Sequence, residues 1–138
     1  MSESDLIERT YRAYFTVFQM RDPRAITPYY HIPSLFVTSA GAVALTNVRD
    51  AELFFERLIY TLRERDYARS VLTRVEVKML AAEIALLNAS AERYTGDGQL
   101  AERVSSLHTF RKEEGTWRIT MSMMYDYDPA YAFDLTSR

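Results

Sequence analysis

Two histidines and several tyrosines are the side chains in this sequence best suited to proton-transfer chemistry. His31 lies in an irregular segment between Pro28 and Pro33, and an imidazole can act as an acid or a base near neutral pH. His108 lies in the middle of a predicted strand. Tyr14, in the first predicted helix, could donate a hydrogen bond to a carbonyl group or a developing oxyanion. We therefore take His31 and Tyr14 as the candidate catalytic residues.

Each of these side chains also has a structural interpretation. A loop histidine can hydrogen-bond to the backbone, and Tyr11 and Tyr14 can be core aromatics with satisfied hydroxyl groups. His108 can face a cavity or the other face of the sheet. Asn88 and Glu92 share a strand face with apolar residues, so their polar groups need partners. Those partners are either a ligand or water in a cavity, or a second subunit.

Motifs for other kinds of chemistry are missing from the sequence. It has no P-loop, no glycine-rich dinucleotide fingerprint, no zinc-protease His-Glu-x-x-His motif and no nucleophile elbow. It contains 0 Cys, which excludes thiolate metal sites and thiol nucleophiles, and the acidic run 126–128 has no second cluster to complete a metal site. We therefore expect no metal and no cofactor.

Charge and hydropathy restrict the partners and the location of the chain. A net charge of -2 gives no electrostatic reason to bind nucleic acid or an anionic membrane. The acidic start lacks the features of a signal peptide, and no apolar stretch approaches the roughly 20 residues that span a membrane. Because the absence of cysteine fits a reducing compartment, we expect a cytoplasmic protein.

The order of the patterns is helix first and then sheet. Apolar residues recur at helical spacing from residue 5 to about 65, with a helix break at Asp22-Pro23, a small hairpin around Ala40-Gly41 and a cap for a third helix at Asn47. The apolar stripe of that third helix comprises Ala51, Phe54, Phe55, Leu58, Ile59 and Leu62. This order predicts an α+β fold in which about three N-terminal helices pack on a curved, mainly antiparallel sheet.

Long strand-like segments follow from residue 67 to 127. The turns Gly96-Asp97-Gly98 and Glu113-Glu114-Gly115 separate them, and a phase slip predicts a bulge near Ser105-Ser106. In the last strand we expect Trp117, Ile119, Met121, Met123 and Tyr125 to share one face. Several strands are apolar on both faces, so something must cover the second face. The simplest cover is another copy of the chain, which predicts a homodimer formed through the sheet.

The pattern resembles the nuclear-transport-factor-2-like superfamily, which includes SnoaL-like polyketide cyclases, ketosteroid isomerases and scytalone dehydratase. The resemblance is carried by Asp22-Pro23, the hairpin around Ala40-Gly41, the helix from Val48 and the run 115–119. It implies a cone-shaped, cystatin-like α+β barrel with a pocket, formed as a single domain over residues 1–138 with a tail loosely attached from about residue 128. The fold hosts unrelated activities and does not define a function.

Two departures from the superfamily pattern bear on function. No Asp or Glu lies between Arg24 and Arg49, where isomerase-like members carry their base, and no histidine follows the run 117–119. We therefore predict a SnoaL-like protein that binds a small apolar molecule. The alternatives are a cofactor-free isomerase, dehydratase or cyclase using His and Tyr, or a dimeric interaction module. With His31 at the rim, the expected pocket comprises Tyr11, Tyr14, Phe18, Tyr30, Phe55, Asn88, Glu92, His108, Met121 and Met123.

Overall fold

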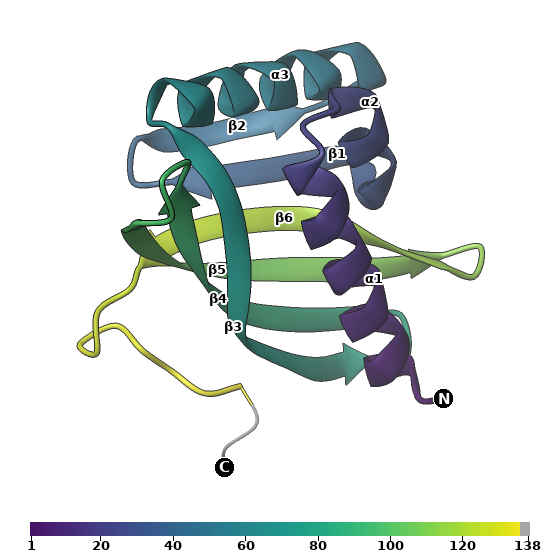
Figure 1. The fold of residues 1–138 in the computed structure, drawn as a ribbon. Helices are drawn as coiled ribbons and strands as arrows, with labels where there is room; N and C mark the ends of the chain where they lie inside the picture. Colours follow the sequence, from purple (N-terminus) through teal and green to yellow (C-terminus); the bar gives the residue numbers. More distant parts are fainter. Residues whose placement is uncertain (136–138) are drawn as a thin grey trace.

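The computed structural model describes residues 1–135 and confirms the α+β class. Its helices are α1 (Glu3–Gln19), α2 (Pro23–Ile26) and α3 (Val48–Glu64), with a 3-10 turn η1 (Thr27–Tyr29) after α2. Figure 1 shows α1 lying across the curved sheet and α3 lying beside β2 at one end. Within residues 1–135, no helix is long and apolar enough to cross a membrane.

The six strands form one mainly antiparallel sheet. They are β1 (Tyr30–Thr38), β2 (Gly41–Leu45), β3 (Tyr67–Ala81), β4 (Ile84–Thr95), β5 (Leu100–Glu113) and β6 (Thr116–Asp126). Their order across the sheet is β2-β1-β6-β5-β4-β3, and among these described strands only the β1–β6 pair is parallel. The β5–β6 turn has positive φ at Glu114 and Gly115, as a tight hairpin requires.

The helices begin at polar caps. Asn47 caps α3, because its side chain accepts a hydrogen bond from the backbone nitrogen of Asp50 at 2.8 Å. Asp22 caps α2 in the same way. The cap of α1 is Ser2, which forms a reciprocal capping box with Asp5.

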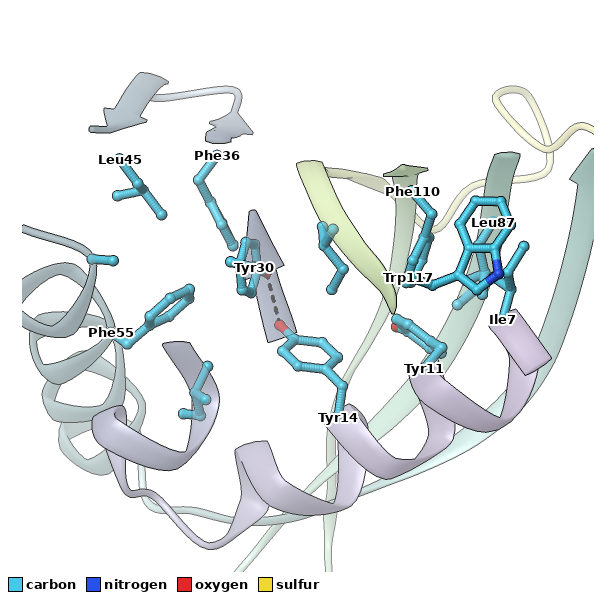
Figure 2. Close-up of a cluster of buried hydrophobic side chains, with 14 of the residues drawn as sticks. Ile7, Tyr11, Tyr14, Tyr30, Phe36, Leu45, Phe55, Leu87, Phe110 and Trp117 are labelled. Atoms are coloured by element: carbon cyan, nitrogen blue, oxygen red, sulfur yellow. Dashed lines mark hydrogen bonds between the residues drawn. The ribbon is translucent and has the colours of Figure 1, made fainter. Parts of the chain in front are cut away.

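The core lies between the helices and the inner face of the sheet, the face that meets α1 and α3. Figure 2 shows side chains from α1, α3, β1 and the long strands meeting in this layer. Trp117 and Ile119 both belong to it, which confirms that they share a face. Glu3 ties α1 to the sheet, because its carboxylate accepts hydrogen bonds from Trp117 Nε1 at 2.6 Å and from Lys112 Nζ at 2.9 Å.

A bulge in β6 reverses the faces of the strand. Phe110 of β5 pairs with Ile119, but Thr109 pairs with Met121, so Thr120 is an extra residue. Every side chain after Thr120 therefore points to the opposite face from the one predicted by simple alternation. The expectation that Trp117, Ile119, Met121, Met123 and Tyr125 share one face therefore holds only for the first two. Met121, Met123 and Tyr125 lie on the outer face.

The bulge expected near Ser105-Ser106 is absent, because both residues keep a continuous register with β4. The tail after β6 reaches the outer face of the sheet. The Phe133 ring lies 5.5 Å from that of Tyr125, and the Phe133 carbonyl accepts a hydrogen bond from Arg74 at 2.9 Å. Phe133 thus provides an attachment point for the tail.

Candidate functional site

A cavity of about 470 Å³ opens between α1, α3 and the inner face of the sheet. Its wall is largely aromatic and aliphatic, because the C-terminal half of α1 contributes four aromatic rings to it. The wall is formed by Tyr11, Tyr14, Phe15, Phe18, Phe36, Leu58, Ala89, Ala91 and Met124. The small alanines of β4 leave room for the cavity opposite the rings of α1.

Charged side chains gather at the mouth of the cavity. Arg93 of β4 and Glu102 of β5 form an ion pair at 2.9 Å, and both line the cavity. Arg65, Arg103 and Asp126 also contribute to the lining. Since the apolar wall lies inside this charged rim, the cavity suits a molecule with an apolar body.

The floor of the cavity carries a chain of hydrogen bonds. The Tyr14 hydroxyl lies 2.9 Å from that of Tyr30, as the dashed line in Figure 2 marks, and the Tyr30 hydroxyl lies 2.7 Å from Ser122 Oγ. Ser122 Oγ is 2.7 Å from His108 Nδ1, and His108 Nε2 is 3.0 Å from Ser106 Oγ. The β6 bulge makes this chain possible, because it turns Ser122 inward opposite His108, its partner in the β5–β6 register.

Burial keeps the floor uncharged. Desolvation lowers the pKa of His108 from 6.5 to about 3, so its imidazole is neutral at pH 7. Desolvation raises the pKa of Tyr11 to about 12, although the Ser106 side chain acts in the opposite direction. The pKa of Tyr14 is likewise raised well above its ordinary value by burial. The floor therefore offers hydroxyl groups and a neutral imidazole as hydrogen-bonding partners.

The structure places His31 away from this cavity. Its Nδ1 lies 2.9 Å from the backbone oxygen of Pro33, and its Nε2 lies 2.8 Å from a carboxylate oxygen of Glu113, which also binds Arg111. Successive strand residues point to opposite faces, and Tyr30 occupies the inward position at the start of β1. The expectation that His31 borders the cavity was therefore wrong, whereas Tyr14 does line it.

Four of the predicted pocket residues line the cavity, namely Tyr11, Tyr14, Phe18 and His108. The other six lie elsewhere. Tyr30 lies behind Tyr14 in the hydrogen-bonded chain, and Phe55 is fully buried in the core, where its ring is 4.8 Å from that of Tyr30.

The remaining four predicted pocket residues, Asn88, Glu92, Met121 and Met123, lie on the outer face of the sheet. Asn88 is buried there and accepts a hydrogen bond from the Tyr125 hydroxyl, and Glu92 forms an ion pair with Arg103 at 3.1 Å. The partner of Asn88 is thus the chain itself rather than a cavity ligand.

Sequence reasoning missed two floor residues, Ser106 and Ser122. Ser106 lies two residues before His108, so strand alternation places both on one face and could have identified it. No comparable signal marks Ser122, because its inward position depends on the bulge. Within the described part of the chain, no group of three or more His, Asp or Glu side chains is placed to hold a metal ion.

Solved structures share this fold at low sequence identity. An uncharacterized protein with a cystatin-like fold from Caulobacter vibrioides is 19% identical, with a TM-score of 0.71 over 94% of this chain and 93% of its own. An NTF2-like protein with a cystatin-like fold from Novosphingobium aromaticivorans is 13% identical, with a TM-score of 0.72 over 90% of this chain and 82% of its own. An NTF2-like protein of unknown function from Pseudomonas putida KT2440 is 14% identical, with a TM-score of 0.71 over 98% and 96%. These matches confirm the cystatin-like α+β cone.

No curated protein matches the sequence. A family described as NTF2-like protein (DUF6841) matches residues 2–127, which include every helix and strand of the fold. This match agrees with the resemblance to the nuclear-transport-factor-2-like superfamily that the sequence suggested. The chain therefore belongs to the NTF2-like family DUF6841.

Proposed function

We propose that this protein binds a small, mostly apolar molecule in the cavity between α1 and the inner face of the sheet. The observation that carries the proposal is the cavity itself, about 470 Å³ in volume and walled mainly by aromatic and aliphatic side chains. Ligand pockets in proteins commonly have volumes of roughly 300–1,000 Å³, with apolar walls and a few placed polar groups. A molecule of two fused rings suits this space.

Binding without catalysis is better supported than acid–base catalysis. His31, the candidate acid or base, contacts Glu113 outside the cavity. His108 does line the cavity, but with a pKa of about 3 its imidazole is a weak base. Of the carboxylates at the mouth, Glu102 is engaged by Arg93. The walls thus provide shape and apolar contact, and among residues 1–135 no strong base lies at the floor.

Isothermal titration calorimetry with 1-tetralone and naphthalene tests the proposal. Glucose and adenosine monophosphate are the negative controls and should bind more weakly. Phe18→Trp adds bulk to the wall and should weaken binding of the ring compounds at least tenfold. Tyr60→Trp is the matched control, because Tyr60 is exposed on α3 and should leave affinity unchanged. Equal binding to wild type and Phe18→Trp, or preferred binding of the sugar or nucleotide, would contradict the proposal.

We also propose that a second copy of the chain covers the outer face of the sheet. This face carries the neighbouring apolar residues Leu35, Val37, Leu107, Met121 and Met123 on β1, β5 and β6. An apolar face can pair with itself about a two-fold axis, since each side then buries the same residues. Met123→Glu should give a monomer in sedimentation velocity, and Leu80→Glu, at an exposed end of β3, should not. A wild-type monomer at micromolar concentration would refute the dimer.

A further inference from the structure

The hydrogen-bonded chain at the floor joins two residues that line the cavity. It runs from Tyr14 through Tyr30, Ser122 and His108 to Ser106, and each contact spans 2.7–3.0 Å. Tyr14 and Ser106 line the cavity, whereas Tyr30 and Ser122 are buried behind it. The interior members satisfy one another, and Ser106 has a second side-chain partner in the Tyr11 hydroxyl. The remaining hydrogen-bonding capacity therefore lies at Ser106 and Tyr14.

The donors and acceptors of this hydrogen-bonded chain can be arranged in two directions. A neutral imidazole has one donor and one acceptor nitrogen, and each hydroxyl group donates once and accepts up to twice. In the first direction Tyr14 donates to Tyr30, Tyr30 to Ser122, Ser122 to His108 Nδ1, and His108 Nε2 donates to Ser106. In this direction the Tyr11 hydroxyl can also donate to Ser106, so the Ser106 hydrogen is left for an acceptor in the cavity. In the second direction every donor and acceptor is exchanged, and Ser106 offers only lone pairs.

We propose that Ser106 is the binding subsite for a neutral carbonyl or hydroxyl group of the ligand, and that this group sets the direction of the chain. A carbonyl accepts from Ser106 and selects the tautomer of His108 with hydrogen on Nε2. A phenolic hydroxyl donates to Ser106 and selects the tautomer with hydrogen on Nδ1. This inference rests on the proposed function, because it names the ligand class that the same cavity takes.

The exchange between the two directions balances in protons. When the Nε2–H tautomer replaces the Nδ1–H tautomer, Ser106 passes its proton to Nε2 and takes one from a cavity molecule. At the same time, the Nδ1 proton passes to Ser122, and each hydroxyl hands its own proton on until Tyr14 releases one to the cavity. No group gains or loses charge overall. Both directions keep the same heavy-atom contacts, so a ligand needs little free energy to choose between them.

The position of Ser106 suits it to hydrogen-bond the carbonyl or hydroxyl group of the ligand. The Tyr11 ring lies 4.9 Å from that of His108 and forms part of the same wall, so a ring stacked there brings a substituent close to Ser106. A charged substituent would be poorly solvated against this neutral floor. The charged partner for an anion lies instead at the mouth, where Arg93 is paired with Glu102.

Affinity for four probes that share two fused rings tests the ligand class. Tetralin has no polar group, 1-tetralone has a carbonyl, 1-naphthol has a hydroxyl and 1-naphthoate is an anion. The ketone and the naphthol should bind about three- to tenfold more tightly than tetralin, as a hydrogen bond of ordinary net strength gives. Ser106→Ala should remove this advantage, while the neighbouring outer-face variant Ser105→Ala should keep it. Preference for naphthoate would overturn the neutral subsite.

Nitrogen-15 NMR of the His108 imidazole in wild-type protein tests the direction of the chain without any substitution. The ketone complex should show the Nε2–H tautomer and the naphthol complex the Nδ1–H tautomer. The same tautomer in both complexes would overturn the inference, even if both probes bind. If none of the probes binds, the proposed function itself fails, so the two failures are distinguishable.

Discussion

Replacing Ser122 by alanine should lower the free energy of unfolding, because it removes a buried hydrogen bond and leaves a buried nitrogen without a partner. Ser122 is fully buried and joins the two halves of the floor chain, with contacts of 2.7 Å to both Tyr30 and His108. In the variant Tyr30 keeps Tyr14 as a partner, but His108 Nδ1 loses Ser122 inside the protein. One lost hydrogen bond and one buried unsatisfied nitrogen together cost about 2–3 kcal/mol. For a domain of this size that corresponds to a Tm lowered by roughly 10 °C.

Urea unfolding of single and double variants measures this cost. The double variant that combines Ser122→Ala with His108→Leu removes both partners, so it should cost less than the sum of the two single changes. Ser105→Ala is the control, because Ser105 contacts Ser90 on the outer face at 3.2 Å and should cost under about 1 kcal/mol. Our reasoning is refuted if Ser122→Ala unfolds within error of wild type, or if the two changes are additive.

Three further experiments test the core residue Ile119, the buried His108, and His31, which lies outside the cavity. Ile119→Ala should lower the free energy of unfolding by about 2–5 kcal/mol, and an unchanged urea midpoint would contradict its place in the core. The depressed pKa of His108 means that the unfolded state binds an extra proton, so stability should fall as pH drops from 6.5 toward 3, by up to about 1.4 kcal/mol per pH unit. His108→Leu should lose this slope between pH 6 and 4.5, and an identical slope in both proteins would argue against the buried neutral imidazole. His31→Ala should leave the affinity for 1-tetralone within about twofold of wild type by calorimetry, whereas a tenfold loss would place His31 at the site.

Local signals in the sequence predict the helices and turns because those features depend on neighbouring residues. Asp22-Pro23 and Asn47 cap helices through contacts within three residues, and Glu114-Gly115 forms the expected turn. The apolar stripe of α3 packs against the core as helical spacing requires, with Phe54 and Leu58 only partly buried. Tyr11, Tyr14 and Phe18 line the cavity together, and their shared side of α1 follows from the helical periodicity of the sequence.

The outward position of Met121 and Met123 could not be read in the same way. Strand faces depend on register with a neighbouring strand, and one extra residue exchanges all later faces. Alternation from Trp117 and Ile119 predicts both methionines inside, and only the pairing with Thr109 shows otherwise. For His31 the difficulty was similar, because proline flanks do not show which of two adjacent residues faces inward. The inward position belongs to Tyr30.

The bulge at Thr120 links the stability of the fold to the chemistry of the cavity. Before it, β6 contributes Trp117 and Ile119 to the core. After it, the same strand contributes Ser122 to the floor and sends Met121 to the outer face. Without the extra residue, simple alternation would place a thioether where the floor chain now has a hydroxyl, and His108 Nδ1 would lose its partner. One inserted residue thus lets a single strand serve an apolar core, a polar floor and an apolar outer face.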